Sequence, residues 1–456
     1  MDVGNKKKKM ENLREVVLNP EALHQLIETL DEKEDYEELI KVYELLLENN
    51  PQDINALIEL AIIYADNFHN YDKANDYLNQ VLNIDPNNAE AYFHKGRIIE
   101  KWKEDYEEAR NNYLKAIALD NHLVDGYLNL SWLYLEHFND VNTSYIVIQE
   151  GLKYNEDSNL YTQLAYIEYH KYHELAKAQE HLTKAIELDS ENDLAYTYLG
   201  QIYLDENQFD QAKDTFAKAF SLPNINEVLI HEYSRLLILV YRDIDGAIEV
   251  FKKAIEHFPD NVIYYAYLAN LYFITGNTYQ AKYYLREAES FTIDDQEALL
   301  MIGYLKVMMD NDKEGALMYF EKVIELNPTN INALSFIGFY NLVNTKEVDK
   351  ALEYFKKIAS LSHDNLAVHF IIAQIYLQHY NDVQKAIDHL LSVDTSHLDV
   401  QEICQLYFLI GNIFEKFERN NHKALEYYEK AYQLKPDKYL EDIINRLYEL
   451  DKTLIN

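Results

Sequence analysis

Two histidines and one cysteine are the residues whose types and spacing could carry chemistry. His170 and His173 stand in an HxxH spacing, which could offer two ligands to a metal ion. Two ligands are too few for a zinc site, and the acidic residues near them are frequent throughout this chain. Cys404, the only cysteine, lies in no nucleophile motif and has no partner for an intramolecular disulfide. We therefore expect no metal, no cofactor, no catalytic residue and no enzymatic activity.

The charge balance narrows the class of partner. The 456 residues include 78 acidic and 42 basic ones, a formal net charge of −36. Binding nucleic acid through phosphates needs a surplus of Lys and Arg along one face, and this chain lacks that surplus. We expect no nucleic-acid partner. The acidity favours solubility first and the attraction of a basic partner second.

The elements that would position any site are helices in a repeating pattern. In the stretch 192–223, NDLAYTYLGQIYLDENQFDQAKDTFAKAFSLP, the residues at i, i+3, i+4 and i+7 from Tyr196 share one helical face. The second half repeats this arrangement from Ala212 to Ala219, and a polar turn separates the halves. This pattern predicts a helical hairpin that must bury its apolar face against neighbours.

Small residues that recur at equivalent positions show that the hairpin is repeated about twelve times. One such column of positions lies in the first helix of each hairpin, and two lie in the second helix. All three columns advance by 34 or 35 residues per repeat until a last step of 38. Such a period indicates an α-solenoid. The column in the first helix is Ile27, Ala61, Gly96, Ser131, Ala165, Gly200, Ser234, Ala269, Gly303, Gly338, Ala373 and Gly411.

These columns resemble the tetratricopeptide repeat family. The family pattern has Leu-Gly in the first helix, followed by Tyr, and Ala, an aromatic residue and Ala in the second; Leu199, Gly200 and Phe216 match it here. The resemblance covers residues 20–436. It implies an all-α, right-handed superhelical solenoid of antiparallel helix pairs. Most copies carry one extra residue in the turn between their helices.

The domain organisation follows from the same period. We expect a polar, partly disordered tail over 1–19, about twelve hairpins over 20–436 and a capping helix over 437–456, with no second globular domain. For the final helix we expect an apolar face that includes Tyr439, Ile443, Leu447 and Leu450. All seven prolines fall where one hairpin gives way to the next, at residues 20, 51, 86, 223, 259, 328 and 436.

The N-terminal segment and the single cysteine indicate in which cellular compartment the protein lies. The lysine run Lys6–Lys9 is a solvated segment in our interpretation, and the residues after it do not resemble the apolar part of a secretory signal. No apolar run is long enough to span a bilayer, so we expect no membrane insertion. A single cysteine is compatible with a reducing compartment, and we expect a cytoplasmic protein.

The resemblance also implies where a ligand would bind. In this family, the first helices line a concave groove, and ligands contact defined positions along it. Mapped onto this chain, those positions are aromatic and carry little charge, and they lack the Lys and Asn pair with which a well-known subclass clamps acidic chain ends. The candidate peptide-binding residues are Phe93, Arg97, Trp132, Tyr166, Arg235, Tyr304, Phe339, Phe370 and Phe408.

Three functions remain open on this basis, of which the least favoured is an accessory domain for a catalytic activity that no motif here reveals. The first is a scaffold or adaptor that binds a peptide segment of a partner protein, possessing basic and apolar parts, in the aromatic groove. The alternative is a structural or assembly component that acts through its acidic convex face or through self-association. In the second case the groove aromatics would be packing residues, because an aromatic at helical spacing is more often part of a core.

Overall fold

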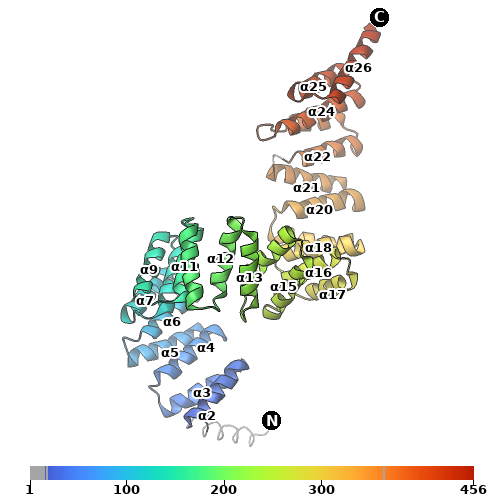
Figure 1. Ribbon diagram of the computed structural model, residues 1–456. Coiled ribbons are helices and arrows are strands. Elements are labelled where there is room, and N and C mark those ends of the chain that lie inside the picture. The colour runs from blue at the N-terminus through green and yellow to red at the C-terminus, as the bar shows by residue number, and fades with distance from the viewer. Residues whose placement is uncertain (1–15, 17–18, 363–364, 456) are drawn as a thin grey trace, which may run out of the picture. The chain divides into compact units, whose positions relative to one another are not determined.

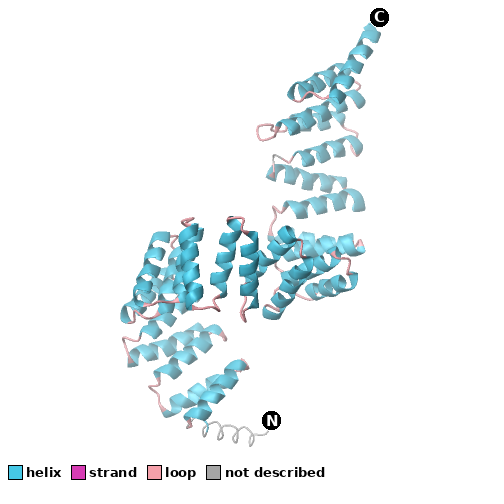
Figure 2. Ribbon diagram, viewed as in Figure 1, coloured by secondary structure: helices cyan, strands magenta, loops and turns pink. Residues whose placement is uncertain are grey.

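The computed structural model describes residue 16, residues 19–362 and residues 365–455. The described chain is built from helices in tandem and contains no strand (Figure 2). The all-α repeat fold is therefore confirmed. The lysine run Lys6–Lys9 lies outside the described residues.

The chain divides into two compact units between Arg242 and Asp243. Figure 1 follows the helices of both units by colour along the chain. The helices of the N-terminal unit are α2 (Pro20–Glu32), α3 (Tyr36–Asn49), α4 (Ile54–Asp66), α5 (Tyr71–Ile84), α6 (Ala89–Lys103), α7 (Tyr106–Leu119), α8 (Val124–Glu136), α9 (Val141–Tyr154), α10 (Ser158–His170), α11 (Leu175–Leu188), α12 (Asp193–Asp205), α13 (Phe209–Ser221), α14 (Glu227–Leu236) and the π-helix η1 (Leu237–Tyr241).

The C-terminal unit continues the same alternation of first and second helices. Its helices are α15 (Ile244–His257), α16 (Val262–Ile274), α17 (Thr278–Glu289), α18 (Gln296–Asp310), α19 (Lys313–Leu326), α20 (Ile331–Tyr340), the π-helix η2 (Asn341–Thr345), α21 (Val348–Leu361), α22 (Leu366–Gln378), α23 (Val383–Leu391), α24 (Val400–Lys416), α25 (Asn421–Leu434) and α26 (Lys438–Ile455).

Side-chain caps explain where many of the described helices start. Asn88 accepts a hydrogen bond from the Ala91 backbone N–H at 2.8 Å, and Asn192 does the same for Ala195 at 2.9 Å. Such caps satisfy backbone donors that have no partner inside the helix. Pro20 is the first residue of α2, and the other six prolines lie in the loops between hairpins, as predicted.

The turn inside each hairpin has a fixed geometry. One residue per turn has a positive φ, at steps of 34 to 38 residues; these residues are Glu34, His69, Glu104, Asn139, His173, Asn207, Arg242, Gly276, Asn311, Lys346, Asn381 and Arg419. The left-handed conformation closes the first helix and turns the chain back toward the second. Glycine fills this position only once.

The extra residue predicted for most copies is visible in the hydrogen bonds that close the turns. In short turns the N–H donates to a carbonyl five residues back, as from Gln208 to Tyr203 at 2.8 Å. In seven of the described hairpins it reaches six residues back, as from Asn70 to Tyr64 at 2.8 Å. In η2 the added residue widens the last helical turn, and the Lys346 N–H bonds to the Asn341 carbonyl.

The small-residue columns lie where the two helices of a hairpin are closest. A Cβ atom added to Gly200 would lie 2.4 Å from Cε1 of Phe216, and one added to Gly303 would lie 3.0 Å from Cε2 of Phe320. Both phenylalanines are fully buried. These two hairpins therefore pack a ring of the second helix directly on the backbone of the first.

The final helix buries only part of the apolar face that we expected. Leu440 and Leu447 are buried, and Ile443 packs partly against the same cluster. Tyr439 is 65% exposed and Leu450 is 46% exposed, so our assignment of these two residues to the buried face was wrong. Burial follows the contact that α26 makes with the last hairpin, which a helical pattern alone does not specify. In the described part of the chain, no helix is long and apolar enough to cross a membrane.

Candidate functional site

Aromatic side chains join three consecutive first helices of the N-terminal unit. The ring of Trp132 on α8 lies 4.8 Å from that of Tyr166 on α10, and Tyr166 lies 5.4 Å from Tyr198 on α12. The His170 ring lies 4.6 Å from that of Tyr166, tilted against it, and meets that of Tyr198 edge to face at 5.8 Å. We call Trp132, Tyr166, His170 and Tyr198 the aromatic ladder. His170 is exposed, and the other three rings are half-buried.

A buried polar network fixes the helix in the middle of this ladder. Glu168 on α10 is fully buried and accepts hydrogen bonds from His181 Nδ1 at 2.7 Å and from the Tyr145 hydroxyl at 3.2 Å. The bond to Glu168 raises the pKa of His181. Since these partners come from α11 and α9, α10 is held on both sides. The Tyr166 ring therefore projects from a fixed support.

Carboxylates surround the aromatic ladder. Burial, and then the nearby Glu136 carboxylate, raise the pKa of Tyr166. Burial, Tyr166 and then Asp193 raise the pKa of Tyr198 to about 12. Asp205 accepts a hydrogen bond from the Tyr169 hydroxyl at 2.7 Å. The surroundings of these rings are negative.

The other predicted residues of the N-terminal unit do not join the aromatic ladder. Phe93 is buried at 6% exposure and packs on Tyr113 at 6.0 Å. Arg97 pairs with Asp66 of the preceding hairpin, Nη2 to Oδ2 at 2.6 Å, and both side chains are one-third exposed at 33%. The Arg235 side chain is 56% exposed, with Nη2 3.7 Å from Oε2 of Glu232.

The C-terminal unit has an apolar surface on its first helices. Tyr304 on α18 is 43% exposed and Phe339 on α20 is 45% exposed. Tyr304 shares a pocket of about 460 Å³ with Ile274 and Met308, which are 61% and 66% exposed. Val343 in η2 is 62% exposed. We call Ile274, Tyr304, Met308, Phe339 and Val343 the apolar rows.

Each aromatic of the apolar rows is anchored on its own hairpin. The Tyr304 ring meets the ring of Phe320 edge to face at 5.1 Å, and Phe339 meets Phe355 in the same way at 5.0 Å. Phe320 and Phe355 are fully buried. One edge of each exposed ring is thus held by the core, while the rest remains accessible.

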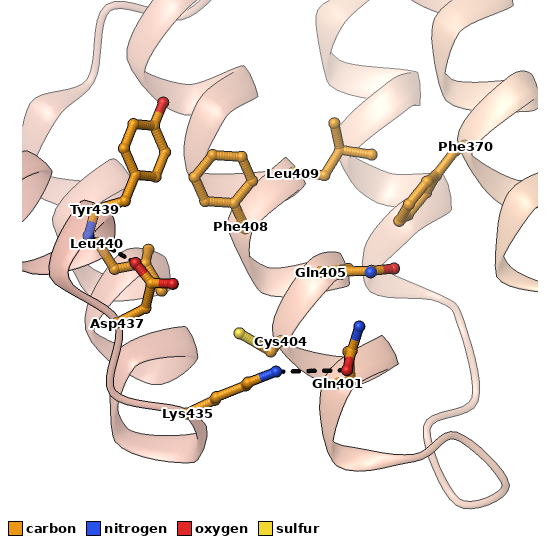
Figure 3. Close-up of a pocket in the computed structure, with 10 residues that line it drawn as sticks. All are labelled: Phe370, Gln401, Cys404, Gln405, Phe408, Leu409, Lys435, Asp437, Tyr439 and Leu440. Carbon is orange, nitrogen blue, oxygen red and sulfur yellow. Dashed lines mark hydrogen bonds between the residues drawn. The ribbon is translucent and has the colours of Figure 1, made fainter.

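Phe370 and Phe408 line a further pocket of about 440 Å³ near the end of the chain (Figure 3). The figure shows a line of apolar side chains along one side of this pocket and polar groups beneath it. The polar groups include the Lys435 amine, which lies 3.4 Å from Oε1 of Gln401. Burial raises the pKa of the Cys404 thiol, so the pocket holds a poor nucleophile. The apolar side chains of this pocket's upper side are Phe370, Leu409, Phe408 and Tyr439.

Sequence reasoning missed part of both surfaces because it mapped too few positions. Ile274, Met308 and Val343 each lie five residues after the small residue of the first helix. At that position the fourth to sixth hairpins carry Glu136, His170 and Asp205 instead. Following this column along the chain would have separated an apolar surface from an acidic, aromatic one.

The structure gives no support for a metal centre. In the part of the chain that is described, no group of three or more His, Cys, Asp or Glu residues could hold a metal ion. His173 occupies the left-handed turn position, whereas His170 belongs to the aromatic ladder. The two histidines thus have separate structural roles.

Comparison with known proteins identifies the repeats. Tetratricopeptide repeat family models match residues 170–220, 297–330 and 405–438. The human protein O-mannosyl-transferase TMTC3 is 23% identical over 283 residues, which are 62% of this chain and 27% of that protein. A TPR repeat-containing protein of Methanocaldococcus jannaschii, MJ1428, is 30% identical over 134 residues, which are 29% of this chain and 23% of that protein. The chain thus spans about a quarter of the length of either relative.

Solved structures show similar helical arrays. The human IFIT1 dimer with PPP-AAAA is 18% identical, with 94% of this chain and 95% of that chain covered and a TM-score of 0.44. Yeast Tom70 is 17% identical, with 91% and 95% covered and a TM-score of 0.40.

Proposed function

Because the chain belongs to the tetratricopeptide repeat family, we propose that it is a scaffold or adaptor that binds a segment of another protein along its first helices. One observation carries the proposal: the apolar rows are exposed on consecutive first helices of the C-terminal unit. The proposal assigns the chain a binding role and no catalytic step.

The spacing of the apolar rows favours a peptide over a small ligand. Ile274, Met308 and Val343 follow each other at 34 and 35 residues, so they occupy equivalent places on neighbouring hairpins. Tyr304 and Phe339 form a parallel row. A run of equivalent apolar contacts suits a segment that presents several apolar side chains in series.

The anchoring of the aromatic rings supports the same conclusion. Tyr304 and Phe339 rest on buried phenylalanines, so a partner would order few side chains of this protein on binding. Rigid aromatic anchors of this kind commonly supply most of the free energy of binding. The pocket lined by Phe370 and Phe408 would take a further apolar side chain of the same segment.

The test is a selection from a random peptide library on the full-length protein. We expect enrichment of peptides with several apolar or aromatic residues. A Tyr304→Ser, Met308→Ser, Phe339→Ser variant should bind the enriched peptides at least about tenfold more weakly, since each lost apolar contact costs about 1 kcal/mol or more. Tyr279→Ser is the matched control, because Tyr279 is 79% exposed but lies on a second helix.

Two outcomes would contradict the proposal. Enriched peptides could bind the triple variant and the wild type equally, which would remove the apolar rows from the site. Light scattering could instead show that the wild type self-associates and that the triple variant does not. The rows would then be an assembly interface, which is the alternative function considered from the sequence.

A further inference from the structure

The aromatic ladder and the carboxylates around it form a second surface with different chemistry from the apolar rows. Its rings come from α8, α10 and α12, and its carboxylates are Glu136, Asp193 and Asp205. Glu136 and Asp205 are exposed, and Asp193 is half-buried.

We propose that this surface binds a basic, extended segment of a partner protein, whose guanidinium or ammonium groups lie against the rings of Trp132, Tyr166 and Tyr198. The inference rests on the proposed function, namely that the chain binds protein segments, and it names the chemistry of one such segment. It concerns the N-terminal unit only, so it can fail while the apolar rows still bind their own segment.

The charges at the ladder favour a cation. Besides the three carboxylates, Glu232 lies near Tyr169 and raises its pKa, after burial and Asp205. Two cations oppose them: Lys171, which lowers the pKa of His170 after burial does, and Arg235, which lies 3.7 Å from Glu232. Four carboxylates against two cations leave the surface negative, in a chain whose net charge is −36. Phosphates and acidic chain ends would be repelled.

The aromatic rings add cation–π attraction to the attraction that the carboxylates exert on a cation. The face of Trp or Tyr attracts a cation within about 6 Å, and this attraction grows when water is excluded. Glu136 stands one helical turn after Trp132 on α8, and its carboxylate also lies near Tyr166. A guanidinium placed at this point would meet a ring face and a carboxylate together. Arginine suits such a site better than lysine, because its planar group stacks and forms two hydrogen bonds.

The separation of the rings sets the spacing of the basic residues. The Tyr166 ring lies 4.8 Å from that of Trp132 and 5.4 Å from that of Tyr198. An extended chain advances about 3.3 Å per residue, and its successive side chains point to opposite faces. A segment that crosses α8, α10 and α12 would therefore present a basic side chain at about every second residue.

The experiment uses the fluorescence of Trp132. The chain has two tryptophans, so a Trp102→Phe protein reports on Trp132 alone. The probe is a Gly/Ser peptide with three arginines at every second position, and the control probe carries neutral citrulline at the same positions. We expect a saturable change with the arginine peptide that weakens at higher ionic strength, and at least about tenfold weaker binding of the citrulline peptide.

Substitutions then separate this site from general attraction to an acidic protein. Glu136→Gln should weaken binding of the arginine peptide about threefold, and Tyr166→Leu about fivefold or more. Glu256→Gln is the matched control, because Glu256 is exposed on the second helix α15 and should not affect binding. Circular dichroism checks that all variants are equally folded.

Three results would overturn the inference. The citrulline peptide could bind as tightly as the arginine peptide. Glu136→Gln and Tyr166→Leu could both leave binding unchanged, which would place the peptide elsewhere. Replacing Lys6–Lys9 by glutamine in the full chain could tighten peptide binding about tenfold, which would make the protein's own lysine run the occupant in place of a partner.

Discussion

Gly200 leaves no room for a methyl group. The nearest atoms to an added Cβ belong to Phe216, at 2.4 and 2.7 Å, and this ring is fully buried and cannot swing away. At Gly338, the corresponding distance to Phe355 is 3.1 Å. The same residue type in the same column therefore faces different restraints.

Gly200→Ala and Gly338→Ala should consequently differ in stability. An alanine inside a helix gains about 1 kcal/mol over glycine, and overpacking a core costs about 1–3 kcal/mol. We expect Gly200→Ala to lower the free energy of unfolding by about 1–2 kcal/mol, and Gly338→Ala to change it by less than about 0.5 kcal/mol. Urea denaturation followed by circular dichroism measures both. An unchanged midpoint for Gly200→Ala would show that the small-residue column is misassigned.

His389 should make the C-terminal unit sensitive to acid. Its Nε2 lies 3.2 Å from Nδ1 of His369, and burial, His369 and Lys356 lower its pKa from 6.5 to about 4. Because the unfolded chain takes up the proton more readily, stability should fall as the pH drops from about 6.5 to 4, and this group should contribute no change above that window. His389→Gln should flatten the pH dependence. Equal slopes for both proteins between pH 7 and 5 would refute this assignment.

Single residues also show the limit of sequence reasoning. The small columns were predictable because every hairpin brings its helices together at the same place. The partners of Arg97 and Trp132 were not predictable, because they depend on which side chain a neighbouring hairpin offers, 31 residues before Arg97 and 34 residues after Trp132. Phe93 was mapped to the groove, but its ring lies among the buried residues around Tyr113.

At the scale of elements, the turns between helices are more uniform in backbone than in sequence. Glu, His, Asn, Arg, Lys and Gly all occupy the one left-handed position. For most residues this conformation costs about 1–2 kcal/mol, whereas Asn and Gly tolerate it. The repeat architecture therefore imposes the turn even where the residue disfavours it.

Gly276 allows this cost to be isolated. Its φ is +81°, and no atom outside its immediate neighbours lies within 4 Å of an added Cβ, so a side chain there meets backbone strain and no clash. Gly276→Ala should lower the free energy of unfolding by about 1 kcal/mol, while Gly276→Asn should cost less than half of that. Thermal melting of the two variants measures the difference. If both lose the same stability, side-chain size and not backbone conformation sets the cost.

The extra residue of the longer copies was predictable in number but not in form. Counting the period places it in the turn, yet the chain accommodates it either in a wider turn, as after α4, or as a π-helix, as at Asn341–Thr345. The choice depends on local hydrogen bonds, such as that from the Asn341 side chain to the Ile337 carbonyl at 2.9 Å. The period of the sequence does not reveal whether a wider turn or a π-helix forms.

At the scale of the whole molecule, the chain consists of two compact units, although the repeat pattern runs across their boundary. The two residues at the boundary, Arg242 and Asp243, are neither proline nor glycine, so the sequence does not mark the division there. In a solenoid, each hairpin is stabilised mainly by its immediate neighbours. A local change should therefore remain local.

Hydrogen exchange can test how far a perturbation spreads. Gly200→Ala should reduce the protection of backbone amides in α10–α13, and it should leave α18–α26 unchanged, because those helices share no direct packing with it. Mass spectrometry of peptic fragments resolves the two regions. Equal loss of protection along the whole chain would show that the two units unfold as one.

The division into two units has a consequence for avidity. Each unit carries its own surface, one apolar and one acidic and aromatic, so a single client with both kinds of segment would engage the protein bivalently. Once the first segment is bound, the second is confined near its site at an effective concentration that can reach the millimolar range. Two individually weak contacts would then give a slowly dissociating complex. Its affinity depends on the length of the linker between the two segments of the client.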